Sequence, residues 1–188
     1  MSETRDLGGA VDGGGVERVV LTAHEIAARV AELAHEITGA YPGNEPLLVL
    51  GLLKGSFIFM ADLVRQLDRP VLVDFLVAAS YGEGTVSSGE VRLLYEPETG
   101  LEGKHVILIE DIVDSGTTIN RLVPVLVERE PRSLEICALL HKRLSAKLAL
   151  EPRWVGFDAP QEFLVGYGLD HGESFRQLPF IGSLKSPQ

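Results

Sequence analysis

The sequence is poor in cysteine, in basic residues and in long apolar runs, and each scarcity excludes a class of protein. Cys137 is the single cysteine, so the chain can form neither an internal disulfide nor a cysteine-rich metal site. Its 17 Lys and Arg residues face 27 Asp and Glu residues, and the resulting net charge of −10 argues against sequence-independent binding of nucleic acid. No apolar run reaches the roughly 18 residues of a membrane helix, and residues 1–18 lack the apolar centre of a signal peptide. We therefore expect a cytoplasmic protein that binds neither nucleic acid nor a membrane.

Enough apolar residues remain to build one sizeable core, since they make up 45% of the 188 residues. Residues 1–17 are rich in glycine and predict a flexible N-terminal tail, which leaves 18–188 as a single domain. Thr22 and Glu25 form a capping-box pair at the start of a helix. The apolar face of this helix repeats at helical spacing and consists of Ile26, Val30, Leu33, Ala34 and Ile37.

The rest of the chain alternates between apolar runs typical of strands and longer segments typical of helices. Strands are predicted over residues 47–53, 71–79, 90–95, 105–112, 134–140 and 163–167. Helices are predicted over residues 57–67 and 115–130, and Pro124 inside the second should remove a hydrogen bond or kink it. The alternation predicts an α/β fold, with a mostly parallel sheet flanked by helices on both faces. Ligands of such folds bind beyond the carboxyl ends of the strands.

The most specific pattern follows the apolar run that starts at Val106. Glu110 and Asp111 are adjacent acids at the end of a buried strand, and they cost free energy unless they meet hydroxyls or a cation. The run Asp114-Ser115-Gly116-Thr117-Thr118 then leads into a helix. Its backbone N–H groups, its hydroxyls and the positive end of the helix dipole together suit a phosphate group. If Asp114 or Ser115 merely capped the helix, the two preceding acids would stay unexplained.

Two further loops carry unusual residues. The run Leu53-Lys54-Gly55 directly follows a strand, and a glycine next to a cation lets the backbone approach an anion. The alternative is a plain strand-to-helix turn with a solvated Lys54, and the residues alone favour neither interpretation. Residues 80–89 are rich in glycine and hydroxyl groups and predict a mobile loop, for which an ordinary hairpin is the simpler interpretation.

These motifs resemble the signature of the type I phosphoribosyltransferases, and the run Leu53-Lys54-Gly55 resembles the hypoxanthine-guanine branch of that family. The resemblance covers nearly all of residues 47–184. It implies the family fold, in which terminal segments add a small hood to the sheet. It also implies that Glu110 and Asp111 hold the ribose hydroxyls of phosphoribosyl pyrophosphate (PRPP). The 5′-phosphate would lie on Val113, Asp114, Ser115, Gly116, Thr117 and Thr118.

The resemblance assigns the pyrophosphate and lid residues as well. Pyrophosphate would contact Leu53, Lys54, Gly55 and Arg176, and the peptide bond between the first two would be cis. Ser80 and Tyr81 would begin a lid that keeps water from the reacting ribose. From its residue type alone, Arg176 could equally be a solvated charge.

The purine base would lie against Lys142, Phe163, Leu164 and Asp170, with the lysine at O6, the phenylalanine ring stacked and the leucine backbone in contact. Asp114 would manage a proton near N7, and Mg²⁺ would be supported by Glu110, Asp111 and Asp170. Without the resemblance, Lys142 would be interpreted as a surface lysine and Phe163 as a core residue. His171 departs from the family pattern, which commonly has an aromatic residue there.

The implied reaction transfers phosphoribosyl from PRPP to N9 of hypoxanthine or guanine, and gives IMP or GMP and pyrophosphate. Lysine only donates hydrogen bonds, so Lys142 suits a carbonyl oxygen and predicts rejection of adenine. The family also implies a homodimer or homotetramer. Two alternatives stay open: a regulator of the same fold that senses PRPP or nucleotides, and a phosphoribosyltransferase for xanthine.

Overall fold

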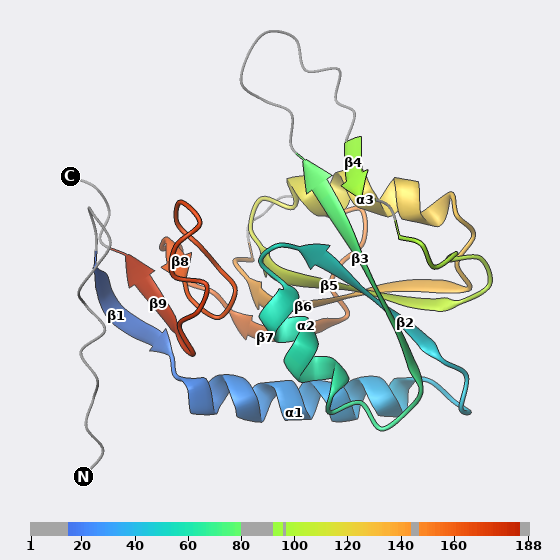
Figure 1. Cartoon of the computed structure of the whole chain (residues 1–188), viewed down its shortest axis with the longest axis horizontal. Coiled ribbons are helices and arrows are strands. Elements are labelled where there is room, and N and C mark those ends of the chain that lie inside the picture. The colour runs from blue at the N-terminus through green and yellow to red at the C-terminus, as the bar shows by residue number, and fades with distance from the viewer. Residues whose placement is uncertain (1–14, 80–91, 96, 144–146, 185–188) are drawn as a thin grey trace, which may run out of the picture.

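The computed structural model describes residues 15–79, 92–95, 97–143 and 147–184, which form two sheets and three helices (Figure 1). The larger sheet has six strands in the order β4-β3-β2-β5-β6-β7. In that order, their bounds are Arg92–Tyr95, Val71–Ala79, Leu47–Leu53, His105–Val113, Ser133–His141 and Trp154–Asp158. All neighbours pair in parallel except the edge strand β4, which runs antiparallel to β3. The predicted α/β fold with a mostly parallel sheet is confirmed.

Helices cover both faces of this sheet, which explains why the central strands are apolar along their whole length. Helices α1 (Ala23–Ala40) and α2 (Phe57–Val64) enclose one core, which contains Ile26, Leu33 and Phe59. Helix α3 (Thr117–Val127) encloses the other core, with Ile119, Leu122 and Leu126. Strand β2 lies between the two cores, and six of its seven residues are buried.

Helix α1 begins as its sequence predicts. The Thr22 N–H donates to Glu25 Oε2 at 2.8 Å, and the Glu25 N–H donates to Thr22 Oγ1 at 3.3 Å, so the capping box is complete. All five residues of the predicted apolar face are buried. Helix α3 is shorter than predicted, because Gly116 is left-handed and starts it at Thr117. Pro124 lies within α3, which continues past it to Val127.

A second, antiparallel sheet forms the hood and joins the two ends of the described chain. Its order is β1-β9-β8, with bounds Val16–Leu21, Ile181–Leu184 and Leu164–Val165 (Figure 1). The strand predicted over 163–167 is therefore only two residues long and belongs to the hood rather than to the parallel sheet. Strand β1 includes Val16 and Glu17, which the sequence had placed in the tail, while residues 1–14 lie outside the described part.

Within the described ranges, no helix is both long enough and apolar enough to cross a membrane.

Candidate active site

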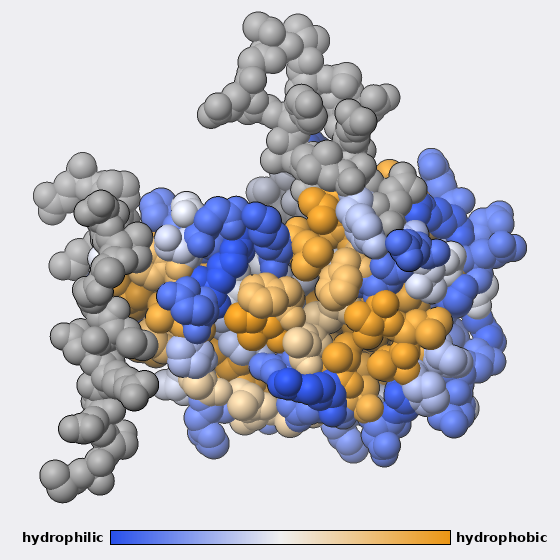
Figure 2. Space-filling view, in the orientation of Figure 1, coloured by the Kyte–Doolittle hydropathy of each residue, from blue (hydrophilic) through white to orange (hydrophobic). Residues whose placement is uncertain are grey.

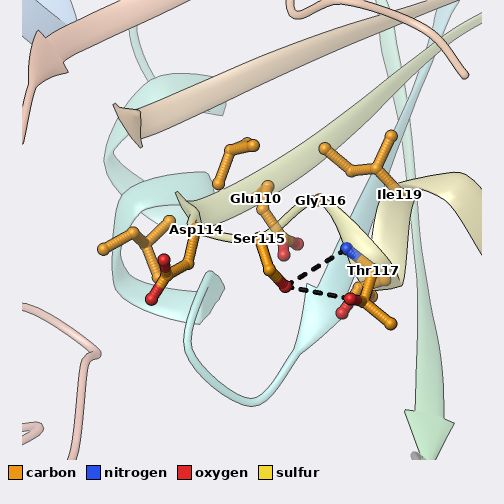
Figure 3. Close-up of a pocket in the computed structure, with 9 residues that line it drawn as sticks. Glu110, Asp114, Ser115, Gly116, Thr117 and Ile119 are labelled. Carbon is orange, nitrogen blue, oxygen red and sulfur yellow. Dashed lines mark hydrogen bonds between the residues drawn. The ribbon is translucent and has the colours of Figure 1, made fainter. Parts of the chain in front are cut away.

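The predicted phosphate loop connects β5 to α3 and surrounds a hollow of about 70 Å³ (Figure 3). The hollow is lined by Glu110, Ile112, Val113, Asp114, Ser115, Gly116, Thr117, Thr118 and Ile119. Ser115 Oγ lies 2.9 Å from Thr117 Oγ1, so two hydroxyls meet at its edge. The six residues predicted to hold a phosphate are thus brought together around one concave surface.

Gly116 decides the shape of this loop. It is the N-cap residue of α3, with a φ of 75°, and as a glycine it has no side chain with which to cap the helix. Gly116 therefore occupies the N-cap position instead of Asp114 or Ser115, although Ser115 Oγ accepts a long hydrogen bond of 3.4 Å from the Thr117 N–H. A Cβ at Gly116 would lie 2.1 Å from Leu148 Cδ2, so a side chain there would also clash. The start of a helix presents backbone N–H groups that can donate to an anion.

The two acids lie within β5 rather than after it, so their side chains leave opposite faces of the strand. Glu110 is buried, and its Oε2 has no hydrogen-bond partner among the described residues. Burial, with the charge of Asp111 as a second cause, raises the pKa of Glu110 well above its ordinary value. Asp111 Oδ1 accepts the Ile112 N–H at 2.9 Å, which partly offsets the rise that burial causes in its own pKa. An unpaired buried carboxyl of this kind is unfavourable unless a ligand completes it.

The predicted pyrophosphate loop is wedged between Asp111 and the hood. The Leu53–Lys54 peptide bond is cis. A Cβ at Gly55 would lie 1.6 Å from Asp111 Oδ2, and a Cβ at Gly168 would lie 2.0 Å from the Gly55 carbonyl oxygen. Only glycine at both positions allows the three segments to approach this closely.

Arg176 is held in place from the hood, so it is not a solvated surface charge. Its side chain is only 19% exposed. One guanidinium nitrogen donates to the Gly168 carbonyl at 2.8 Å, while the other lies 2.7 Å from Asp170 Oδ1 and 3.1 Å from Glu173 Oε2. Glu173 Oε1 also pairs with Lys54 Nζ at 2.9 Å. Two predicted pyrophosphate ligands, Lys54 and Arg176, are thereby brought together through one carboxylate.

Lys142 and Asp114 form an ion pair where the loop after β6 meets the phosphate loop. Lys142 Nζ lies 2.9 Å from Asp114 Oδ2, and the Lys142 N–H donates to the Val113 carbonyl at 3.0 Å. The lysine side chain is 14% exposed, so it is not an ordinary surface lysine. Its ammonium pairs with Asp114, which is one of the residues that line the hollow.

Phe163 lies in the hood and is 53% exposed, which excludes its interpretation as a core residue. His171 meets it edge-on, with ring centroids 5.1 Å apart. Leu164 is buried in β8, and the nearby Gln161 side chain donates to the Lys142 carbonyl at 3.2 Å. The hood segment that carries the aromatic ring therefore contacts the segment that carries the lysine.

Comparison with known proteins agrees with this geometry. The family of phosphoribosyl transferase domains matches residues 19–171. The chain belongs to this family. A hypoxanthine-guanine phosphoribosyltransferase of Dictyostelium discoideum is 45% identical over 170 residues, which cover 89% of this chain and 94% of that protein.

Solved phosphoribosyltransferases share the fold as well as the sequence. A hypoxanthine-guanine phosphoribosyltransferase of Bacillus anthracis has a TM-score of 0.85 at 38% identity, and the match covers 93% of this chain and 100% of that one. The chain also matches the bifunctional protein TilS/HprT of Listeria innocua at 42% identity over 183 residues, and it spans 28% of that protein. The family prediction from the motifs is confirmed, and with it the assignment of the chain as a phosphoribosyltransferase.

Ser80 and Tyr81, predicted to begin the lid of this phosphoribosyltransferase, lie outside the described residues. Glu173 was not predicted at all, although it pairs with both Lys54 and Arg176. Hydrogen bonds from Lys54 and Arg176, in that order, lower its pKa. A charged residue three positions before Arg176 was the only signal in the sequence.

Proposed function

We propose that this phosphoribosyltransferase salvages purines by transferring phosphoribosyl from PRPP to N9 of hypoxanthine or guanine, which gives IMP or GMP and pyrophosphate. The observation that carries the proposal is the 2.9 Å pair between Lys142 and Asp114. Lys142 is a hydrogen-bond donor that suits the O6 atom of a purine. Asp114 lines the hollow that suits a sugar phosphate, so the pair links the two predicted subsites. No described feature favours a regulator that only senses nucleotides.

The chain's own residues divide the work of the reaction. The loop Val113–Thr118 holds the 5′-phosphate, and Glu110 and Asp111 accept hydrogen bonds from the ribose hydroxyls. Lys142 donates to O6 of the base while Phe163, already exposed, stacks on the ring. As N9 bonds to C1′ and the bond from C1′ to pyrophosphate breaks, the base loses a proton. Asp114 accepts this proton near N7.

Leu164 and Asp170 complete the base pocket in this proposal, and Leu53, Lys54, Gly55 and Arg176 hold the leaving group. Cations around a leaving pyrophosphate stabilise the charge that develops as the bond breaks. The lid, which begins at Ser80 and Tyr81, would exclude water from the ribose in its charged state.

Magnesium fits this site as an ion carried mainly by substrate oxygens. Among the described residues, no group of three or more His, Cys, Asp or Glu side chains is placed to hold a metal. Mg²⁺ commonly binds one or two carboxylates together with substrate phosphates. Glu110 offers a buried oxygen that has no partner among the described residues. Burial raises the pKa of Asp111, and the charge of Asp170 adds to the rise. When bound, the ion would neutralise charge on the pyrophosphate, with Glu110, Asp111 and Asp170 in support.

The test of the proposal is a panel of bases. Purified protein with PRPP and Mg²⁺ is offered hypoxanthine, guanine, xanthine, adenine and uracil in separate reactions. Turnover is expected with hypoxanthine, guanine or both, and adenine should fail because its amino group leaves the Lys142 ammonium without an acceptor. Turnover with xanthine alone would assign the chain to a different branch, and turnover with adenine or uracil but not hypoxanthine would refute the base specificity.

We also propose that the enzyme assembles as a homodimer through exposed apolar residues of α2, β3 and β4, or as a homotetramer built from such dimers. Hydrophobic side chains gather on this face around α2 and β3 (Figure 2). Phe57, Val73 and Tyr95 are each more than 40% exposed. Tyr95 of β4 is the strand partner of Val77 in β3. Such an exposed apolar patch is typical of a protein interface.

Light scattering tests this assembly. The Val73→Asp variant should shift the mass toward that of a monomer, because it places a charge in the patch. Val127→Asp is the matched control, since Val127 is also exposed but lies on α3. A native protein that is monomeric, or a Val73→Asp variant that assembles normally, would contradict the proposal.

A further inference from the structure

Glu173 occupies the position between two cations where an anionic ligand would be expected. Its Oε1 pairs with Lys54 Nζ at 2.9 Å, and its Oε2 pairs with Arg176 at 3.1 Å. One carboxylate therefore uses its two oxygens on two cations that come from segments far apart in the sequence. Pyrophosphate, as proposed above, would present its oxygens to the same two residues.

The position of Glu173 is built into the hood. Its φ of 64° is left-handed, a conformation that non-glycine residues rarely adopt. The turn is fixed by the Glu173 N–H, which donates to Asp170 Oδ2 at 2.8 Å, and by paired backbone bonds between His171 and Ser174. A glycine would suit this backbone better, so the turn is not a reason for glutamate to be here.

The Glu173 side chain can leave without disturbing Arg176. The arginine keeps its bonds to Asp170 at 2.7 Å and to the Gly168 carbonyl at 2.8 Å. Glu173 itself is 64% exposed, and exposed ion pairs contribute little stability, so the carboxylate is easily displaced. A ligand with more negative charge would win the competition for these cations.

We propose that Glu173 is an internal competitor for pyrophosphate. This inference rests on the proposed function. In the unliganded protein its carboxylate neutralises Lys54 and Arg176, and PRPP or pyrophosphate displaces it. The competition weakens the binding of the pyrophosphate group. Glu173 thus sets the affinity for the leaving group without touching the base or the phosphate loop.

The experiment compares native protein, Glu173→Gln and Glu45→Gln by calorimetric titration with pyrophosphate in the presence of Mg²⁺. Glutamine keeps the size of the side chain and removes its charge. Glu45→Gln is the matched control, because Glu45 is 62% exposed and pairs with Arg132 at 2.8 Å at the other end of β2. Glu173→Gln should bind pyrophosphate about threefold to tenfold more tightly, as expected from two weak ion pairs. Its KM for PRPP should fall in the same direction, while its KM for hypoxanthine and the properties of the control stay native.

Each other outcome is decisive. Unchanged pyrophosphate binding by Glu173→Gln, in a native protein that binds pyrophosphate and turns over PRPP, would overturn this inference and leave the proposed function intact. Weaker binding would also overturn it, because Glu173 would then help to hold the ligand, directly or through the metal. If the native protein neither binds pyrophosphate nor uses PRPP, the proposed function fails together with the inference. Glu173→Ala repeats the measurement if the glutamine variant does not fold.

Discussion

Replacing Gly55 with alanine tests whether the pyrophosphate loop must be wedged against Asp111. The new Cβ would lie 1.6 Å from Asp111 Oδ2, whereas carbon and oxygen atoms in contact are about 3.4 Å apart. The loop or the carboxylate must therefore shift by more than about 1 Å. Both groups are predicted to hold PRPP, so either shift displaces a substrate contact.

The expected loss can be estimated in two ways. Forcing an extra carbon into a filled space costs about 1–3 kcal/mol, which corresponds to a roughly 5- to 150-fold fall in kcat/KM if the cost falls on the transition state. A misplacement of about 1 Å in a reacting group similarly costs about 100-fold. We therefore expect kcat/KM for PRPP to fall by about one to two orders of magnitude.

Steady-state kinetics with varied PRPP measures this effect, and thermal unfolding measures stability beside it. The melting temperature of Gly55→Ala should change by only a few degrees, because the loop that contains Gly55 lies outside the two hydrophobic cores. Gly39→Ala is the control: Gly39 lies in α1, and no atom outside its chain neighbours and its own helix backbone lies within 4 Å of its would-be Cβ. Alanine also favours a helix. A Gly55→Ala enzyme with native kcat/KM for PRPP would refute the reasoning.

Three other substitutions probe single groups. Asp114→Asn should bind PRPP normally in a titration but lose most turnover, since an amide cannot accept the proton; a native rate would remove the acid/base role. Glu110→Gln should raise the melting temperature at neutral pH, because it removes a buried unpaired carboxylate, yet weaken PRPP binding; a lower melting temperature would contradict this. Burial lowers the pKa of His141 below its ordinary value, and the charge of Arg143 lowers it further. As the pH falls below about 6.5, this histidine takes up a proton in the unfolded chain before it does so in the folded protein. The free energy of unfolding therefore falls as the pH drops through this range. Urea unfolding from about pH 7.5 to about pH 5.5 should show a smaller loss for His141→Phe than for native protein; equal losses would exclude His141 as the cause.

Much of the larger sheet could be predicted because its central strands are buried on both faces. The bounds of β2 and β3 agree with the prediction, since each is a largely apolar run between turns. Strands β7 and β9 were missed, because each is short and contains a glycine. The hood strand at 164–165 was placed in the wrong sheet, because apolar character does not specify a pairing partner.

Within the site, residues that are adjacent in the sequence could be predicted, whereas contacts between distant residues could not. The phosphate loop is one continuous run of sequence, so its residues could be named and the structure places them around one hollow. Glu173 could not be found, because its bond to Lys54 joins residues 119 positions apart and depends on a left-handed turn. The conformation of Gly116 was also hidden, since a glycine beside hydroxyl residues is compatible with several turns.

The contact among Gly55, Asp111 and Gly168 makes three distant parts of the chain interdependent. A side chain at either glycine can be accommodated only if its neighbour retreats, so substitutions at these positions should be strongly non-additive. Substitutions at these three positions are then tolerated only when they occur together. Designers who wish to alter how the enzyme handles its leaving group should redesign the three positions together.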